Sequence, residues 1–303
     1  EAGSTVNVYA NGVLLGSATE SLITAGSFSF TTAVLLDGAY SVTATATDST
    51  GNLSAEAAPR SFIVDTVAPS GPAITSAALT NDSTPVISGS AEVGSTVTVV
   101  VAGATYSTTA TTGTWSIDTE TATPTSGTLA INPNGSNSVS VTARDAAGTT
   151  SAATTQTLLV DTTLPTVTIT DDKATTTNGD ILYTFTFSED VSGFTAADIT
   201  VSAGTAGLFT QVSGSIYQLT VTPPANLAGN ITVGVAAGVA IDAAANSNSI
   251  ATNNVQAYDT EAPSAPVIAA PAASTNDNTV TLTLNAEAGS TVKVYANGVL
   301  LGS

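Results

Sequence analysis

The side chains that could do chemistry in this chain are carboxylates, because the other reactive types are scarce or missing. The 303 residues include 23 Asp and Glu but only four Lys and Arg, and they include no His, Cys or Met. Without His or Cys there is no Ser-His-Asp or Cys-His nucleophile, no tetrahedral zinc site and no disulfide. Grouped carboxylate oxygens suit Ca²⁺, which takes about six to eight oxygen ligands. The composition therefore favours calcium binding, and we expect no enzymatic activity.

The same charge balance limits the partners. A formal net charge of −19 repels nucleic acids and anionic lipid surfaces, which proteins hold through clustered Lys and Arg. No apolar run approaches the roughly 20 residues that span a bilayer, and no signal-peptide pattern is present. We therefore expect neither nucleic-acid binding nor membrane insertion, and we expect any export signal to lie outside these residues.

Internal repeats divide the chain into domains. Residues 1–17 read EAGSTVNVYANGVLLGS and residues 287–303 read EAGSTVKVYANGVLLGS. A shorter motif recurs as VDTVAP, VDTTLP and YDTEAP, each ending in a proline that stiffens the chain: Pro69, Pro165 and Pro263. We interpret these motifs as joints between domains. They divide the chain into the C-terminal part of one domain, two complete domains and the N-terminal part of the next domain: 1–64, 65–160, 161–258 and 259–303.

Within each stretch, apolar and polar residues alternate with a period of two, as in ILYTFTF over 181–187. This alternation is typical of strands with one buried face. About seven short strands in roughly 95 residues is the size of an immunoglobulin-like sandwich. We therefore predict an all-β fold, with tandem immunoglobulin-like β-sandwiches in an extended array. Helix should be limited to single turns, such as one over 195–198.

Turn residues separate the predicted strands. The dipeptides Asn11-Gly12, Asp37-Gly38 and Asn134-Gly135 are expected to adopt the positive φ of tight turns. Trp115 and the tyrosines at 9, 40, 183 and 217 fall at strand positions. We expect them to pack in cores rather than to form sugar-stacking platforms.

The predicted topology indicates where carboxylates should gather. In a seven-strand sandwich, the second-to-third and sixth-to-seventh loops lie at the end where the preceding joint enters. We expect a set of calcium ligands at this end of each domain. For 65–160 the set is Asp65, Glu92 and Asp145, and for 161–258 it is Asp161, Glu189, Asp190 and Asp242. For the divided domain it is Asp259 and Glu287, and Glu1 and Asp48 are the corresponding positions of the first stretch. The alternative is that the joint aspartates only cap turns and the loop acids are only solvated.

Several segments carry a family resemblance. ATDSTGN (46–52), ARDAAGT (143–149) and SAEVGSTVTV (90–99) resemble the bacterial Ig-like repeats of giant type I-secreted adhesins, the biofilm-associated and non-fimbrial RTX-type proteins. FTFSEDVSGFTAADITV (185–201) resembles a second Ig-like subtype of the same proteins. The resemblance implies an extracellular, non-catalytic stalk at the bacterial cell surface, for adhesion and biofilm formation. Its immediate partners would be neighbouring repeats, with calcium and proline stiffening the joints.

Two other functions stay open at this point. The sandwiches could themselves bind a glycan, ice or a host protein, which an exposed aromatic patch or a flat array of threonines would indicate. Alternatively, the chain could be a filament or surface-layer subunit assembled head-to-tail. In that case residues 259–303 of one copy would complete residues 1–64 of the next. A window within a longer continuous chain is the simpler account of the two partial domains.

Overall fold

The computed structural model describes residues 1–269 and 274–303. Strands dominate these residues. Their only helical element is one 3₁₀ turn, η1 (Ala196–Asp198), as the sequence predicts. The described residues include no helix with the length and hydropathy of a membrane span. Contacts divide the chain into two compact units, Glu1–Thr162 and Thr163–Ser303.

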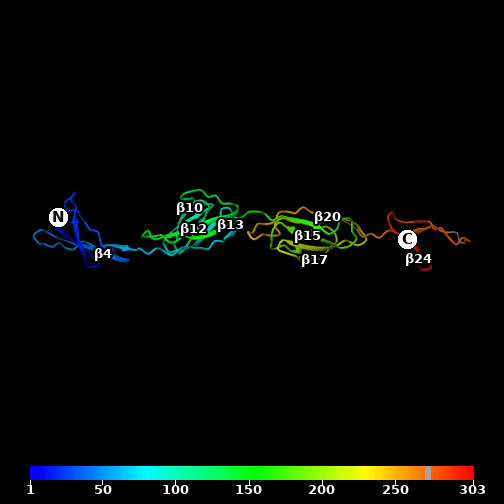
Figure 1. Ribbon diagram of the computed structural model, residues 1–303, viewed down its shortest axis with the longest axis horizontal. Coiled ribbons are helices and arrows are strands. Elements are labelled where there is room, and N and C mark those ends of the chain that lie inside the picture. The colour runs from blue at the N-terminus through cyan, green and yellow to red at the C-terminus, as the bar shows by residue number, and fades with distance from the viewer. Residues whose placement is uncertain (270–273) are drawn as a thin grey trace. The chain divides into compact units, whose positions relative to one another are not determined.

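Residues 1–64 form a single five-stranded sheet, whose strand β4 is labelled in Figure 1. The sheet order is β3-β2-β1-β4-β5. Tyr9 and Tyr40 are half-buried here rather than buried as expected, because the described residues 1–64 form one sheet layer without a second sheet packed on it. Tyr40 stacks on Phe62 with ring centroids 5.6 Å apart. The strands are β1 (Thr5–Ala10), β2 (Val13–Glu20), β3 (Phe28–Ser29), β4 (Gly38–Thr47) and β5 (Arg60–Val64).

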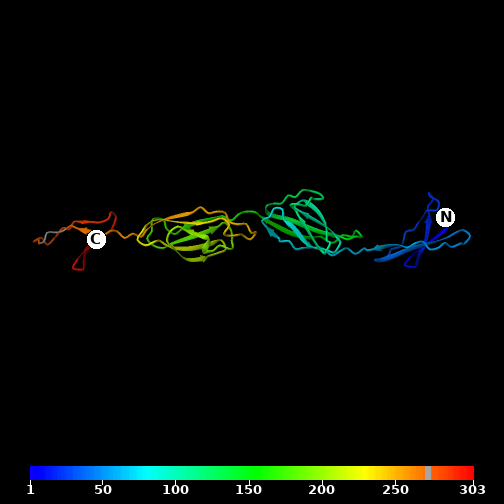
Figure 2. The ribbon, with the colours of Figure 1, turned by 180° about the vertical axis from the view of Figure 1, so that it is seen from behind.

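Residues 65–160 form a complete two-layer sandwich, seen from both sides in Figures 1 and 2. A five-stranded sheet, β10-β9-β12-β13-β7, packs on a three-stranded sheet, β11-β8-β6. Val97, Val99 and Val141 are fully buried between them, and Trp115 is only 3% exposed, as expected for a core residue. The strands are β6 (Ala73–Ile74), β7 (Leu79–Thr80), β8 (Val86–Ser90), β9 (Thr96–Val101), β10 (Ala104–Thr109), β11 (Thr114–Asp118), β12 (Asn134–Arg144) and β13 (Thr154–Asp161).

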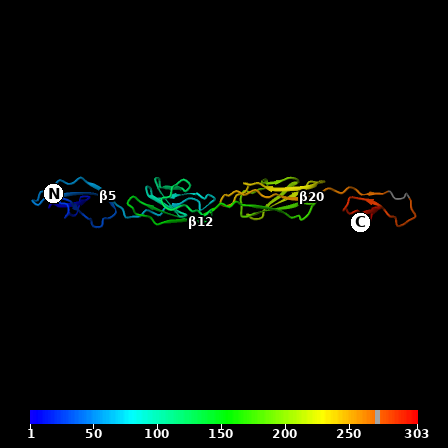
Figure 3. The same cartoon turned by 90° about the horizontal axis from the view of Figure 1, so that it is seen from above.

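Residues 161–258 form a second sandwich with a different topology, in which β20 is labelled from above in Figure 3. One sheet has the order β14-β15-β18-β17 and the other has the order β16-β19-β20. The strands are β14 (Val167–Asp171), β15 (Ile181–Phe187), β16 (Ile199–Val201), β17 (Thr205–Gln211), β18 (Ile216–Thr222), β19 (Ala228–Val235) and β20 (Asn254–Asp259).

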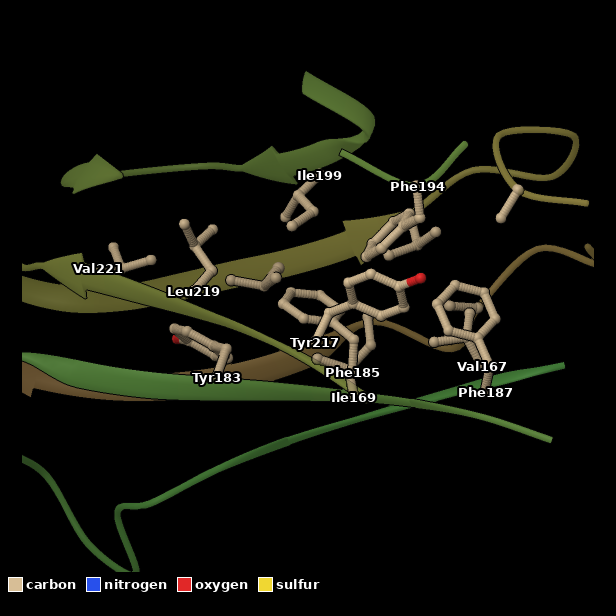
Figure 4. Close-up of a cluster of buried hydrophobic side chains, with 14 of the residues drawn as sticks. Val167, Ile169, Tyr183, Phe185, Phe187, Phe194, Ile199, Tyr217, Leu219 and Val221 are labelled. Atoms are coloured by element: carbon tan, nitrogen blue, oxygen red, sulfur yellow. The ribbon is translucent and has the colours of Figure 1, made fainter. Parts of the chain in front are cut away.

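Aromatic rings fill one end of this second core, as Figure 4 shows. Phe194 packs edge-on against Phe187 and Tyr217, with ring centroids 5.1 Å apart in both pairs. The Tyr217 hydroxyl donates to the Val191 carbonyl at 3.1 Å. Tyr183 is also fully buried, so both tyrosines lie in the core as predicted.

The last stretch contains two short antiparallel pairs, β21 with β22 and β23 with β24. Val299 and Leu300 in the second pair are more than half exposed. The strands are β21 (Val267–Ile268), β22 (Leu284–Asn285), β23 (Val294–Ala296) and β24 (Val299–Gly302).

One of the three predicted turn dipeptides is a tight turn. Asn11 and Gly12 have φ of 53° and 80° and connect β1 to β2. Asn134 and Gly135 instead begin β12 and have no positive φ. Asp37 directly precedes β4 and has no positive φ either, and Gly38, with a φ of 151°, is the first residue of that strand rather than part of a tight turn. At these two positions the prediction was wrong, because the Asp and Asn side chains have another role, described below.

Candidate metal site

The same five-residue turn precedes the last strand of all three domains. Its first residue is Asp48, Asp145 or Asp242. The N–H of that aspartate donates at 3.1 Å to the carbonyl of the residue four positions later, which is Asn52, Thr149 or Asn246. That residue's N–H donates back to Oδ1 of the aspartate at 2.8, 2.9 and 2.8 Å. The chain thus holds each carboxylate in place by local hydrogen bonds. We call these three segments the Asp turns.

Each Asp turn also satisfies the second carboxylate oxygen. Asn52 Nδ2 donates to Oδ2 of Asp48 at 2.7 Å, and Asn246 Nδ2 donates to Oδ2 of Asp242 at 2.8 Å. In Asp145 the same oxygen accepts from the Thr149 hydroxyl. The hydrogen bond from the Asn52 side chain is the main cause that lowers the pKa of Asp48, and the Thr149 hydroxyl has the same effect on the pKa of Asp145. These two carboxylates are therefore anionic at neutral pH.

In 161–258 the sheets bring other carboxylates to the Asp turn. The start of β14 pairs with the end of β15, so Glu189, just after β15, lies at the end where the domain begins. The Asp turn reaches the same end: Ser192 and Ile241 exchange backbone hydrogen bonds of 2.8 and 3.0 Å. The backbone N–H of Ser249, in the loop that follows the turn, donates to the Pro165 carbonyl at 2.9 Å.

The result is a group of three carboxylates. One oxygen each from Asp161, Glu189 and Asp242 lies within 4.8 Å of the others. Asp242 is 6% exposed, and the other two residues are half-buried. Like charges about 4 Å apart near a protein surface repel by roughly 4 kcal/mol, so a cation between them would be stabilising.

The donor set fits Ca²⁺ better than other metals. All ligands are carboxylate oxygens, without the nitrogen or sulfur that structural zinc sites use. Two oxygens on opposite sides of Ca²⁺ lie up to about 5 Å apart, against about 4 Å for the smaller Mg²⁺. The three oxygens lie within 4.8 Å of one another, which is compatible with the separations that Ca²⁺ allows. Three carboxylates supply up to six oxygens, and water could complete the shell.

Asp190 is not part of this group, although the sequence analysis included it. Its side chain is exposed and lies against Gly214, where an added β-carbon would collide with the carboxylate. Adjacent residues at a strand end point to opposite sides, so Glu189 and Asp190 cannot both face the same ion.

In 65–160 the expected loops meet, but the carboxylates do not form such a group. The Thr149 hydroxyl donates to the carbonyl of Val67 in the joint at 3.1 Å, so the Asp turn and the joint are in contact. Asp65 accepts the Val67 N–H in its own turn, and Glu92 is exposed. Among residues 1–269 and 274–303, the three-carboxylate group at 161–258 is the one that satisfies the geometry of a metal site, and it includes none of Asp65, Glu92 and Asp145.

The acids of the divided domain are also spread out. Glu1 and Asp48 line one shallow hollow with Asn52 and Leu53. In the last stretch, Asp259 accepts the Glu261 N–H at 3.0 Å and Glu287 accepts the Ser264 N–H at 3.4 Å. The contact of Asp259 caps a turn, which is the alternative that the sequence left open for Asp65 and Asp259, whereas the contact of Glu287 connects its loop to a residue just after the joint motif.

Threonines that the sequence did not single out bind each joint to the domain before it. Thr66 donates through its N–H and hydroxyl to Oδ1 of Asp37, at 3.1 and 2.9 Å. Thr162 makes the same two bonds to Oδ1 of Asn134, and the Thr260 hydroxyl donates to the Pro224 carbonyl at 2.6 Å. The sequence feature that could have predicted these contacts is the threonine that follows Asp in every joint motif.

Comparisons with known proteins agree with this fold. A family model described as Bacterial Ig-like domain matches residues 1–66 and 73–162, and a second model with the same description matches residues 161–258. A search of curated proteins finds no match.

Three solved structures illustrate the structural likeness. A structure of a 1.5-MDa bacterial ice-binding adhesin is 19% identical, with 85% of this chain and 87% of that chain covered, at a TM-score of 0.34. Fibronectin(III)-like modules of Clostridium thermocellum CbhA are 20% identical, with coverage of 54% and 80%, at 0.33. The D00-D0 domain of intimin is 15% identical, with coverage of 65% and 90%, at 0.23. At such scores the three likenesses carry no argument about function. The family matches, which extend over most of the chain, show that this chain belongs to the bacterial Ig-like domains.

Proposed function

We propose that this chain is a non-catalytic extender of a bacterial cell-surface adhesin, and that Ca²⁺ stiffens its joints. The observation that carries the proposal is the group formed by Asp161, Glu189 and Asp242. Asp161 is the last residue of β13, whereas Glu189 and Asp242 belong to loops of the domain that follows. An ion shared by all three would therefore hold the joint residue Asp161 against two loops of 161–258.

Repetition supports the role of a spacer. Two complete sandwiches and parts of a further domain follow one another through joints of nearly constant sequence. At each joint a threonine bonds back to its own domain, so few residues are left to rotate. Such an array would hold a distal binding region outside the cell, where adhesion and biofilm formation take place.

Bound Ca²⁺ would supply positive charge and coordination to the three carboxylates. The chain's residues prepare the site: Asn246 donates to both oxygens of Asp242 and fixes its orientation. Lys173, one of the four basic residues, pairs with Asp172 at 2.9 Å instead. Arg144, another of the four, donates through Nε to the Gly148 carbonyl.

The reading as a direct glycan or ice binder has less support. Trp115, the single tryptophan, is buried, so it offers no stacking surface. Around it lies a hollow lined by several threonines, including Thr109, Thr111 and Thr114, but the ring faces the core.

Calcium titration of the intact chain tests the proposal. Because a ligand that binds only the folded state raises stability by mass action, millimolar Ca²⁺ should raise the thermal midpoint of the transition assigned to 161–258. Asp242→Asn should abolish most of that increase. The matched control is Asp190→Asn, which removes a neighbouring charge outside the group and should leave the increase intact.

Stiffening needs its own measurement. The chain has no cysteine, so spin labels on single introduced cysteines in 65–160 and in 161–258 report their separation without background. Calcium should narrow the distribution of distances between the two spin labels in the parent chain but not in the Asp242→Asn variant. An unchanged midpoint at millimolar Ca²⁺ would exclude the ion. A raised midpoint with an unchanged distribution would leave binding in place and exclude stiffening.

A further inference from the structure

Strand β17 is the most exposed strand of the domain 161–258. It is the edge strand of the sheet β14-β15-β18-β17 and is labelled at the margin of this domain in Figure 1. Six of its seven residues are exposed, and Phe209, which packs on the core, is half-buried. Because successive residues of a strand point to opposite faces, Leu208, Thr210 and Val212 lie together on the outer face. Leu208 is 74% exposed, and Val212, just after the strand, is 57% exposed.

The backbone of β17 also has an open outer edge. The Val212 N–H donates to the Ile216 carbonyl across the hairpin at 2.8 Å, so this N–H points toward β18. Backbone groups alternate in direction along an edge strand. Those of Thr210 therefore also point toward β18, whereas Phe209 and Gln211 direct their N–H and C=O outward. No strand in the described part of the chain pairs with this outer edge.

Other edges of the two complete domains are covered. Along the outer edge of β10, the Thr105 N–H donates to the Ser126 carbonyl at 2.9 Å, and the Thr125 N–H donates to the Thr105 carbonyl at 2.7 Å. Along the outer edge of β20, the Thr177 N–H donates to the Ala257 carbonyl at 3.3 Å. Native proteins protect uncovered edges with charged residues or proline, because an open edge can pair with another chain. β17 contains neither.

The charge distribution favours a second copy of this chain as the partner. With a formal net charge of −19, two copies repel each other over most approaches. Residues 199–241 contain no charged side chain, so at β17 two copies can meet without directly opposed carboxylates. Carboxylates flank the strand at its ends: Asp180 accepts the Thr222 hydroxyl at 2.7 Å. At the hairpin, Asp190 lies against Gly214. A partner strand also needs an open edge of its own, which β17 of a second copy provides.

We propose that two copies of this chain pair through β17, antiparallel, with Thr210 opposite Thr210 of the other copy. Phe209 then faces Gln211 of the other copy, and because both residues direct their N–H and C=O outward, the strands can exchange backbone hydrogen bonds. Leu208 faces Val212 of the other copy, so the two exposed apolar side chains cover each other. No other antiparallel register brings Leu208 opposite Val212. The contact joins the four-stranded sheets of both copies into one continuous sheet.

The proposed contact is small, so it should be reversible. The bulge between Ala206 and Phe209 limits the regular ladder to the residues that follow it. Such a ladder buries less than the roughly 1,200 Å² at which stable interfaces begin, so the dimer fraction should rise with protein concentration. It should also rise with salt, because the Debye length falls from about 30 Å at 0.01 M to about 3 Å at 1 M and the repulsion between copies weakens. A contact held by opposite charges would weaken instead.

Disulfide cross-linking tests the register, because the parent chain contains no cysteine. Two copies of Thr210→Cys would place their cysteines directly opposite each other, with Cα atoms about 4.5 Å apart, within the range of a disulfide. Mild oxidation should therefore produce a covalent dimer. The matched control is Val212→Cys, on the same face, whose two cysteines would lie about 13 Å apart along the ladder. This control should form at least several-fold less dimer. Mixing Leu208→Cys with Val212→Cys should produce the dimer that neither variant forms alone.

Sedimentation of lysine variants tests the contact without oxidation. Thr210→Lys places two like charges opposite each other and should abolish the salt-promoted dimer. Thr186→Lys makes the same charge change at an exposed position of β15, which lies inside the sheet, and should leave the dimer intact. Far-UV circular dichroism confirms that each variant stays folded.

Both experiments are run in a calcium chelator, so their outcome does not depend on the carboxylate group or on the extender role. Equal dimer yields from Thr210→Cys and Val212→Cys would overturn the proposal. So would a parent chain that stays monomeric up to about 1 mM in high salt, or a dimer that Thr210→Lys leaves unchanged.

Discussion

Thr162 donates both its N–H and its hydroxyl to a single acceptor, Oδ1 of Asn134, at 2.8 and 3.1 Å. This contact fastens the end of β13 to the start of β12, which is the strand it pairs with. The same arrangement joins Thr66 to Asp37, so it is a repeated feature of the joints.

Thr162→Val tests the contribution of this hydroxyl. The substitution keeps the shape of the side chain but removes one donor, so we expect the free energy of unfolding to fall by about 1 kcal/mol. Urea denaturation of the domain transition measures it. Thr157→Val, at an exposed position of the same strand, should change stability by less than about 0.5 kcal/mol. Equal effects of the two variants would show that the joint bond contributes nothing specific.

Ser151 and Ser54 provide a comparison between a buried and an exposed copy of one contact. The Ser151 hydroxyl accepts the Ala143 N–H at 3.0 Å, and the Ser54 hydroxyl accepts the Ala46 N–H at 2.9 Å. Only Ser151 is buried, at 7% exposure. Ser151→Ala should therefore cost about 1–3 kcal/mol, because a buried N–H loses its partner, while Ser54→Ala costs less since water can replace the hydroxyl. Thermal unfolding of both variants measures the two effects. A larger loss of stability in Ser54→Ala than in Ser151→Ala would contradict the prediction.

Ala245 occupies the position in its Asp turn where the other two turns have glycine. Its φ is 71°, against 93° for Gly51 and 99° for Gly148. A left-handed conformation costs an L-residue roughly 1–2 kcal/mol, partly offset by the greater freedom of glycine in the unfolded chain. Ala245→Gly should thus raise the free energy of unfolding by about 0.5 kcal/mol. The control is Ala243→Gly, at an equally exposed position of the same turn without a positive φ, which should lower it.

Because Tyr183 is buried, we expect the domain 161–258 to lose stability at alkaline pH. Burial, with the nearby charges of Asp171 and Asp172, raises its pKa from 10.0 to about 12. Between these values the unfolded chain releases the phenolic proton and the folded domain retains it, so the free energy of unfolding falls as pH rises through 10 to 12. Tyr183→Phe should weaken this fall in urea titrations at pH 9, 10 and 11. Tyr295→Phe, at a 58% exposed position, is the control and should leave the slope unchanged.

The sequence by itself determined the features that depend on local chain chemistry. Alternating residues and the repeated joints established the β-sandwich domains, and Asp at the start of each Asp turn identified the loops that meet the joints. These inferences succeeded because strand burial and short turns depend on residues a few positions apart. The second sandwich, which differs in topology, still obeyed the same rule for loop placement.

Only the tertiary structure decided which carboxylates share a site. Asp161, Glu189 and Asp242 converge, whereas Asp65, Glu92 and Asp145 do not, although both sets lie on loops at the end where their domain begins. The difference arises from side-chain direction, which depends on the path of each loop and on the donors already available to each carboxylate. Topology brings backbone segments together, but a few ångströms of side-chain placement separate a convergent group of carboxylates from a set of turn caps.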